Sequence, residues 1–201
     1  MNFKIFLIKG TRKIRRLLLF AVFQYPRIIK YNMLSNCKKV QGHPKVRQPV
    51  IIDGSGEVLF GDQVEIGIEH SPFYYNGYIY IEVRRAFSKI TFGNNVRISN
   101  CCSFVSGGEG INIGDGTLIG FNCEFFDSDF HDLDPTRRIG GIPKTAKIVI
   151  GRNVFLGSNV KIMKGVVIGD NSIIANSSVV TKSIPENVVA GGTPAKVLRA
   201  V

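Results

Sequence analysis

The sequence predicts an all-β protein, a parallel β-helix of three-sided coils preceded by a short, basic helical segment. Two observations predict this fold: a six-residue repeat in the C-terminal half, and a run of basic residues confined to the N-terminus. In blocks of six, residues 150–185 read IGRNVF, LGSNVK, IMKGVV, IGDNSI, IANSSV and VTKSIP. A fixed period of this kind is typical of solenoids, in which each repeat packs on its neighbours.

The first position of every block is aliphatic, and this position predicts the core. The residues are Ile150, Leu156, Ile162, Ile168, Ile174 and Val180. A period of six matches neither an α-helix nor a single flat strand, but it fits a short strand followed by a turn. Three blocks of six therefore close a triangular coil of about 18 residues, with Gly or Asn at the corners, where a positive φ costs little.

The same pattern also occurs earlier in the chain, and it sets the expected domain boundaries. It appears in FGDQV from Phe60, in FGNNV from Phe92 and in IGD from Ile113. We expect a β-helix over residues 50–189, interrupted by a tyrosine-rich insertion at 69–85 and by a polar loop at 130–147. Residues 1–49 are expected to form a basic helical arm, and residues 190–201 a C-terminal tail.

The net charge of +11 belongs almost entirely to the arm. Twelve Lys or Arg and no acidic residue precede Asp53, whereas the rest of the chain has 14 basic and 15 acidic residues. This distribution argues against nucleic acid as the partner of the main domain. Residues 3–20 mix basic and apolar side chains, a pattern that favours either a membrane interface or a neighbouring subunit.

The arm bears on the expected compartment. Its apolar run at 17–23 is much shorter than the roughly 20 residues that a spanning helix needs, and no small-x-small cleavage site follows it. Cys37, Cys101, Cys102 and Cys123 lack zinc-site spacing and are expected to be reduced thiols. These features predict a cytoplasmic protein, with peripheral contact at the inner membrane face as the further expectation.

His131 is the candidate catalytic residue. It lies in the polar loop among four aspartates, and a nearby carboxylate would orient the imidazole and favour its charged form. A general base is one interpretation, and a solvated loop histidine among turn-forming aspartates is the other. His43 and His70 are distant in sequence, so no local metal cluster is visible and no metal is expected.

The stretch from Ile148 to Arg199 resembles the hexapeptide-repeat acyltransferases. It reads IVIGRNVFLGSNVKIMKGVVIGDNSIIANSSVVTKSIPENVVAGGTPAKVLR, and the likeness extends over roughly residues 93–201. It is greatest to galactoside and maltose O-acetyltransferases and to sugar O-acetyltransferases of surface polysaccharide synthesis. The resemblance implies a left-handed β-helix, a homotrimer, and acetyl-CoA as the co-substrate without a metal.

The resemblance also implies roles for individual residues. His131 matches the histidine that takes the proton of the acceptor hydroxyl, Asn100 would contact the acceptor or the oxyanion, and Phe155 would line the acceptor end of the tunnel, where Trp is usual. The implied coenzyme A contacts are Ser158, Asn176, Thr181, Lys182, Lys196 and Arg199. The structural alternatives are that Asn100 is a corner residue and that Lys196 is a solvated surface charge.

The acceptor and the reaction leave alternatives open. We expect a lipid-linked or nucleotide-linked sugar of a surface polysaccharide. The same fold also serves N-acyltransferases acting on amino sugars and serine acetyltransferases. More remote alternatives are a γ-type carbonic anhydrase, which needs three converging histidines, and a non-catalytic scaffold.

Overall fold

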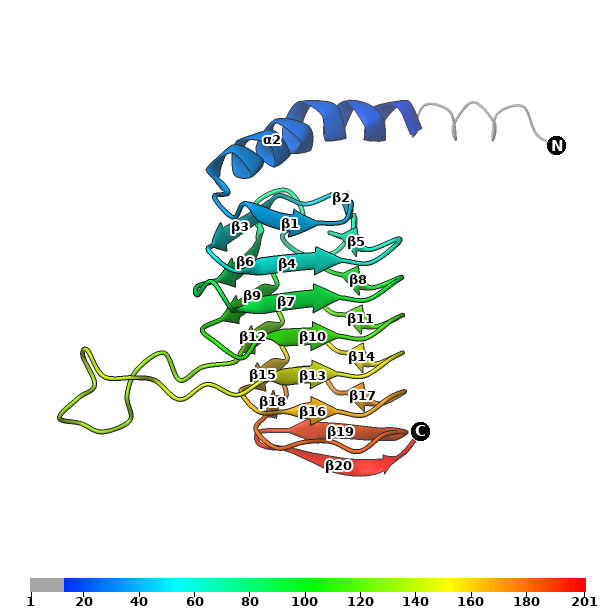
Figure 1. Ribbon diagram of the computed structural model, residues 1–201. Helices are drawn as coiled ribbons and strands as arrows, with labels where there is room; N and C mark the ends of the chain where they lie inside the picture. Colours follow the sequence, from blue (N-terminus) through cyan, green and yellow to red (C-terminus); the bar gives the residue numbers. More distant parts are fainter. Residues whose placement is uncertain (1–12) are drawn as a thin grey trace.

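The computed structural model describes residues 13–201 and shows a helical segment lying across one end of a three-sided β-helix (Figure 1). Residues 13–19 are helical and continue into the π-helix η1 (Phe20–Gln24) and then α2 (Tyr25–Leu34). Within the described residues, no helix has the length and apolar character needed to cross a membrane. The expected helical arm is therefore confirmed for residues 13–34, and its first twelve residues lie outside the described chain.

Three sheets form the sides of the prism. The first sheet contains β1 (Lys39–Gln41), β4 (Glu57–Phe60), β7 (Lys89–Phe92), β10 (Ile111–Ile113), β13 (Ile148–Ile150) and β16 (Val167–Ile168). The second contains β2 (Lys45–Val46), β5 (Glu65–Ile66), β8 (Arg97–Ile98), β11 (Leu118–Ile119), β14 (Phe155–Leu156), β17 (Ile173–Ile174), β19 (Val188–Gly192) and β20 (Ala195–Ala200). The third contains β3 (Val50–Gly54), β6 (Ile79–Val83), β9 (Ser103–Ser106), β12 (Glu124–Phe126), β15 (Lys161–Met163) and β18 (Val179–Val180).

The chain visits the first, second and third sheets in turn as it moves away from the helix, and the winding is left-handed (Figure 1). Each strand pairs in parallel with the strand one coil further on, apart from the antiparallel pair β19–β20. We call the turns between the first and second sheets the first corner, those between the second and third the second corner, and those between the third and first the third corner. The predicted left-handed parallel β-helix is confirmed.

The aliphatic first positions of the repeat form the core, as predicted. Ile150 lies directly against Ile168 in the next coil, Leu156 against Ile174, and Ile162 against Val180. All six are almost completely buried. Nearer the helix, phenylalanines fill the same column, with Phe104 stacked on Phe125 at 4.6 Å between ring centroids.

The first corner shows why the repeat uses Gly and Asn. Asn153, Asn171 and Asn187 have φ values of 54°, 59° and 57°, a region that asparagine tolerates better than most residues. Their side-chain amides form a ladder, with Asn153 donating to Asn171 at 3.0 Å and Asn171 to Asn187 at 2.9 Å. A Cβ on Gly151 would lie 2.5 Å from the Asp170 carboxylate, so the coils pack here only because a side chain is absent.

Three expected boundaries differ from the structure. The β-helix begins at Lys39 rather than at residue 50, because β1 and β2 already pair with β4 and β5. The insertion expected at 69–85 ends before β6, a regular strand whose alternate residues Ile79, Ile81 and Val83 are fully buried. Residues 190–201 are not a tail, because β19 and β20 form a hairpin on the last coil.

Candidate active site

The polar loop at 127–147 leaves the β-helix at the third corner, between β12 and β13, and projects sideways from the prism (Figure 1). Its first residue, Asp127, is fully buried. The carboxylate accepts hydrogen bonds from the Ser106 hydroxyl at 2.7 Å and from the backbone N–H groups of Gly107 and Gly110, both at 2.6 Å. A buried charge needs such partners, and these fix the point where the loop departs.

Two further contacts hold the loop residues just before His131. Asp129 forms an ion pair with Lys164, at 2.7 Å, in the third-corner turn of the next coil. The guanidinium of Arg84 lies over the ring of Phe130, 4.6 Å from its centroid, and Phe126 packs against the same ring. The rigid wall therefore positions the backbone that carries His131.

His131 itself is exposed to solvent. Its Nδ1 atom lies 3.2 Å from the backbone carbonyl oxygen of Arg138, across the loop. A carbonyl oxygen only accepts, so this contact is a hydrogen bond when Nδ1 carries the proton. The other nitrogen, Nε2, then keeps a free lone pair directed away from the contact, which is the state that a general base requires.

The expectation that a neighbouring carboxylate orients His131 is wrong. Asp127 and Asp129 are engaged as described above, and Asp132 faces Arg137 at 3.5 Å. Asp134 accepts hydrogen bonds from the hydroxyl and backbone N–H of Thr136, which hold the pKa of its carboxyl below the usual value. Within residues 13–201, these four aspartates serve the loop backbone and not the imidazole.

Asn100 does not have the role that the resemblance implied. Its side chain is fully buried. The amide nitrogen donates to the carbonyl oxygens of Ile68, Ser71 and Pro72, and the amide oxygen accepts from the N–H of Ile68 at 2.9 Å. No hydrogen-bonding capacity is left for a substrate, so Asn100 is a structural residue that anchors the loop between β5 and β6.

The other predicted site residues lie on separate parts of the prism. Phe155 is on β14 in the second sheet and is 47% exposed, while Ser158 and Asn176 occupy the second corner, where the Ser158 N–H donates to the Asn176 side chain at 2.8 Å. The remaining four are exposed: Thr181 and Lys182 at the third corner, and Lys196 and Arg199 on β20. A single chain thus places the third corner, with His131, apart from the second-sheet wall.

Sequence reasoning missed two parts of this arrangement. Lys164 was not singled out, although the period of the coils contained a signal for it: Phe126 pairs with Met163, so the next residues, Asp127 and Lys164, occupy equivalent positions. The Arg138 carbonyl had no signal, because the fold of a long loop does not follow from a six-residue period.

With this geometry established, the comparisons with known proteins place the chain. Residues 147–182 match the family model described as bacterial transferase hexapeptide, six repeats. The chain belongs to the bacterial hexapeptide-repeat transferases. A Vibrio cholerae hexapeptide-repeat acetyltransferase, VCA0836, crystallised with acetyl coenzyme A, is 27% identical with a TM-score of 0.54, covering 87% of this chain and 76% of that one.

Two curated relatives extend the comparison of this hexapeptide-repeat transferase. A Staphylococcus haemolyticus protein named as acetyltransferase SH0499 is 43% identical over 56% of this chain and 57% of its own length. An Escherichia coli protein, WbbJ, named for O-acetyl transfer in lipopolysaccharide biosynthesis, is 29% identical over 77% of each chain. The chain spans between about a third and three fifths of the first two curated relatives.

Proposed function

We propose that this hexapeptide-repeat transferase moves an acetyl group from acetyl-CoA to a hydroxyl of a sugar. The observation that carries the proposal is the state of His131, an exposed imidazole whose Nδ1 is occupied by the Arg138 carbonyl and whose Nε2 is free. The named activities of the relatives support acetyl transfer, and the Vibrio structure supports acetyl-CoA as the donor.

In this reaction Nε2 of His131 takes the proton of the sugar hydroxyl as its oxygen attacks the thioester carbonyl. A hydroxyl is a weak nucleophile at neutral pH, so a positioned base accelerates the step. The tetrahedral adduct then collapses with loss of the coenzyme A thiolate, which receives the proton from the imidazolium. The Arg138 carbonyl stabilises the charged ring while both nitrogens carry protons.

The active form is proposed to be a homotrimer with one site between each pair of neighbouring chains. Within one chain, His131 leaves the third corner, whereas Phe155 and Ser158 lie on the second sheet and second corner. A site containing both sets therefore needs two copies. The exposed ring of Phe155 offers the apolar wall that the pantetheine arm or the acceptor would contact.

We assign the sugar to the class found in surface polysaccharides, and the reaction to the cytoplasm. The lipopolysaccharide-related name of the Escherichia coli relative supports the first assignment. The second is supported by the four cysteines, which are all free thiols, as expected for a reducing compartment.

Turnover of acetyl-CoA with a panel of sugar acceptors, measured by thiol release, tests the proposal. The panel includes free glycosides, nucleotide sugars and their amino-sugar counterparts, so that transfer to oxygen and to nitrogen are separated. His131→Ala is expected to lower kcat by about 10²–10⁴-fold on the best hydroxyl acceptor, with coenzyme A affinity in calorimetry unchanged. Transfer at the wild-type rate by His131→Ala would falsify the mechanism.

A further inference from the structure

The helix at the end of the prism turns polar residues toward the protein. Gln24 is fully buried, and its amide donates to the carbonyl oxygens of Arg47 at 2.9 Å and Tyr74 at 2.7 Å. The Arg27 guanidinium, one turn further on, donates to the carbonyl oxygen of Gly77 at 2.6 Å. A surface helix ordinarily directs its apolar stripe toward the protein core, so this helix is attached in the opposite sense.

Its outward face is apolar. Leu18, Val22, Ile29 and Met33 are spaced by four, seven and four residues, which places them on one side of a helix. They are 60%, 60%, 45% and 79% exposed. Further exposed apolar side chains flank this stripe: Ile14, Leu17, Phe23, Tyr25 and Leu34. A continuous apolar surface of this kind marks an interaction site.

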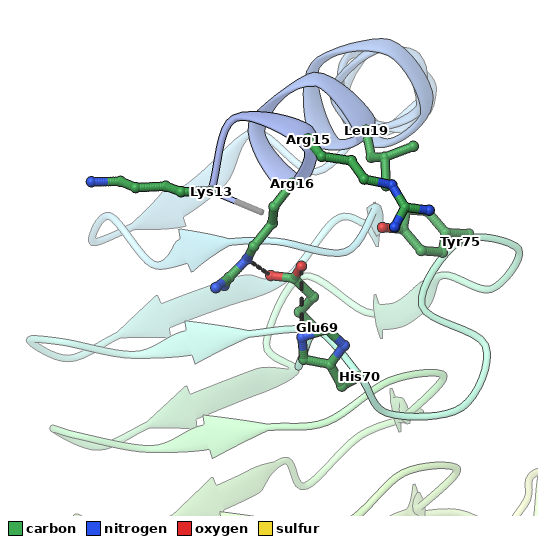
Figure 2. A pocket seen from close by; sticks show the side chains of 7 residues that line it. All are labelled: Lys13, Arg15, Arg16, Leu19, Glu69, His70 and Tyr75. Carbon is green, nitrogen blue, oxygen red and sulfur yellow. Dashed lines mark hydrogen bonds and ion pairs between the residues drawn. The ribbon is translucent and has the colours of Figure 1, made fainter. Parts of the chain in front are cut away.

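The charge around the stripe is positive. Figure 2 shows Lys13, Arg15 and Arg16 at the N-terminal end of the described helix, with Arg16 paired to Glu69. For Lys13, Arg15 and Lys30, the structure from residue 13 onward shows no acidic partner. A cavity of about 610 Å³ opens between these residues and the 69–75 loop, lined by three basic side chains and one acidic side chain.

We propose that this end of the protein docks on an anionic lipid bilayer, with the helix lying in the plane of the interface. The apolar stripe would enter the boundary between headgroups and acyl chains, and the cavity and the unpaired basic residues would take headgroup phosphates. A second copy of the chain is the competing occupant. It fits less well, because apposing two such helices would also bring two uncompensated basic surfaces together.

The orientation has a consequence for the acceptor, and this part rests on the proposed acetyl transfer. The helix lies across the prism end (Figure 1), so docking would set the prism axis roughly along the membrane normal. The His131 loop leaves the fourth coil, about 15 Å from the first at the usual strand spacing. An acceptor sugar carried on a membrane lipid could extend to that level, so a lipid-linked saccharide is the acceptor class that this geometry favours.

Co-sedimentation of the full chain with vesicles tests the docking without any use of activity. We expect binding to vesicles of phosphatidylcholine with about 30% phosphatidylglycerol, little binding to phosphatidylcholine alone, and weaker binding at high salt. Leu18→Asp with Val22→Asp should lower the partition coefficient more than tenfold. Lys13→Gln and Arg15→Gln should each lower it about fivefold, whereas Leu198→Asp, equally exposed on β20 at the opposite end, should not change it.

Two results would overturn the docking proposal. One is absence of binding to the anionic vesicles, or equal binding by the wild type and the Leu18→Asp, Val22→Asp variant. The other is a smaller oligomer for that variant in sedimentation velocity together with no vesicle binding by the wild type, which would assign the stripe to a neighbouring chain. Turnover of a soluble sugar by the same variant should equal that of the wild type, so failure of docking and failure of acetyl transfer are separately visible.

Discussion

Asp127 and His131 lie four residues apart in one loop and have opposite environments. The aspartate is buried and satisfied by one hydroxyl and two backbone N–H groups, whereas the histidine is exposed and touches a single carbonyl oxygen. The first residue fixes where the loop begins, and the second is free to meet a substrate. The sequence predicted the base because a polar loop interrupts a rigid repeat, but it could not assign the aspartates, whose roles depend on the path of the loop.

Replacing Asp127 by Ala should destabilise the protein by about 3 kcal/mol, because three buried donors lose a charged acceptor. Chemical denaturation monitored by circular dichroism measures the change. Glu109→Ala is the control, since Glu109 lies in the same third-corner region and is exposed. Equal stability of the two variants would mean that the Asp127 carboxylate does not hold the loop base.

Asn100 shows the limit of transferring a role by resemblance. Asn100→Ala should cost about 2 to 3 kcal/mol of stability, because one N–H and three carbonyl oxygens of the loop between β5 and β6 lose their partner. Limited proteolysis should then cut at residues 69–78 first. A variant with native stability and a raised KM for the sugar would restore the substrate-binding role that the structure assigns against.

The strands and corners were the most predictable elements, because each coil repeats the same physical demands. Aliphatic first positions, Asn at positive φ and Gly at close approaches all follow from the six-residue period. Prediction failed where the period is hidden or ends. The strand β6 lies beside a tyrosine-rich loop that masks its alternation, and β20 reverses direction after the last coil.

The first corner provides an element-scale prediction about pH. The backbone N–H and guanidinium of Arg152 donate to Asp170, and these bonds lower the pKa of its carboxyl. A carboxyl whose pKa is lower in the folded state adds stability above its unfolded pKa, near 3.9, and this stability is lost as the pH falls through the folded value.

Asp170→Asn should therefore have a lower melting temperature than the wild type at pH 7, and the difference should shrink below about pH 4. The effect should be modest, since the pair is at the surface. Asp62→Asn is the matched control at the same corner, because within residues 13–201 Asp62 has no ion-pair partner. A difference that grows on acidification would contradict the assigned sign.

At the scale of the whole molecule, the prism separates three tasks along and around its axis. One end carries the basic helix with its outward apolar stripe, the third corner carries His131, and the second sheet carries the exposed Phe155. The charge asymmetry of the sequence already pointed to the helix as a separate unit. The separation of corner and wall could not be read from it, since that requires knowing which blocks share a side.

Complementation between inactive chains tests this division most directly. His131→Ala lacks the base, and Phe155→Arg disrupts the wall, so each homotrimer should be inactive in acetyl-CoA turnover with the best sugar acceptor. In trimers co-assembled from equal amounts of both chains, about one quarter of the interfaces pair an intact corner with an intact wall. The account predicts recovery of about a quarter of wild-type activity, and mixed trimers that remain inactive would contradict a site shared between two chains.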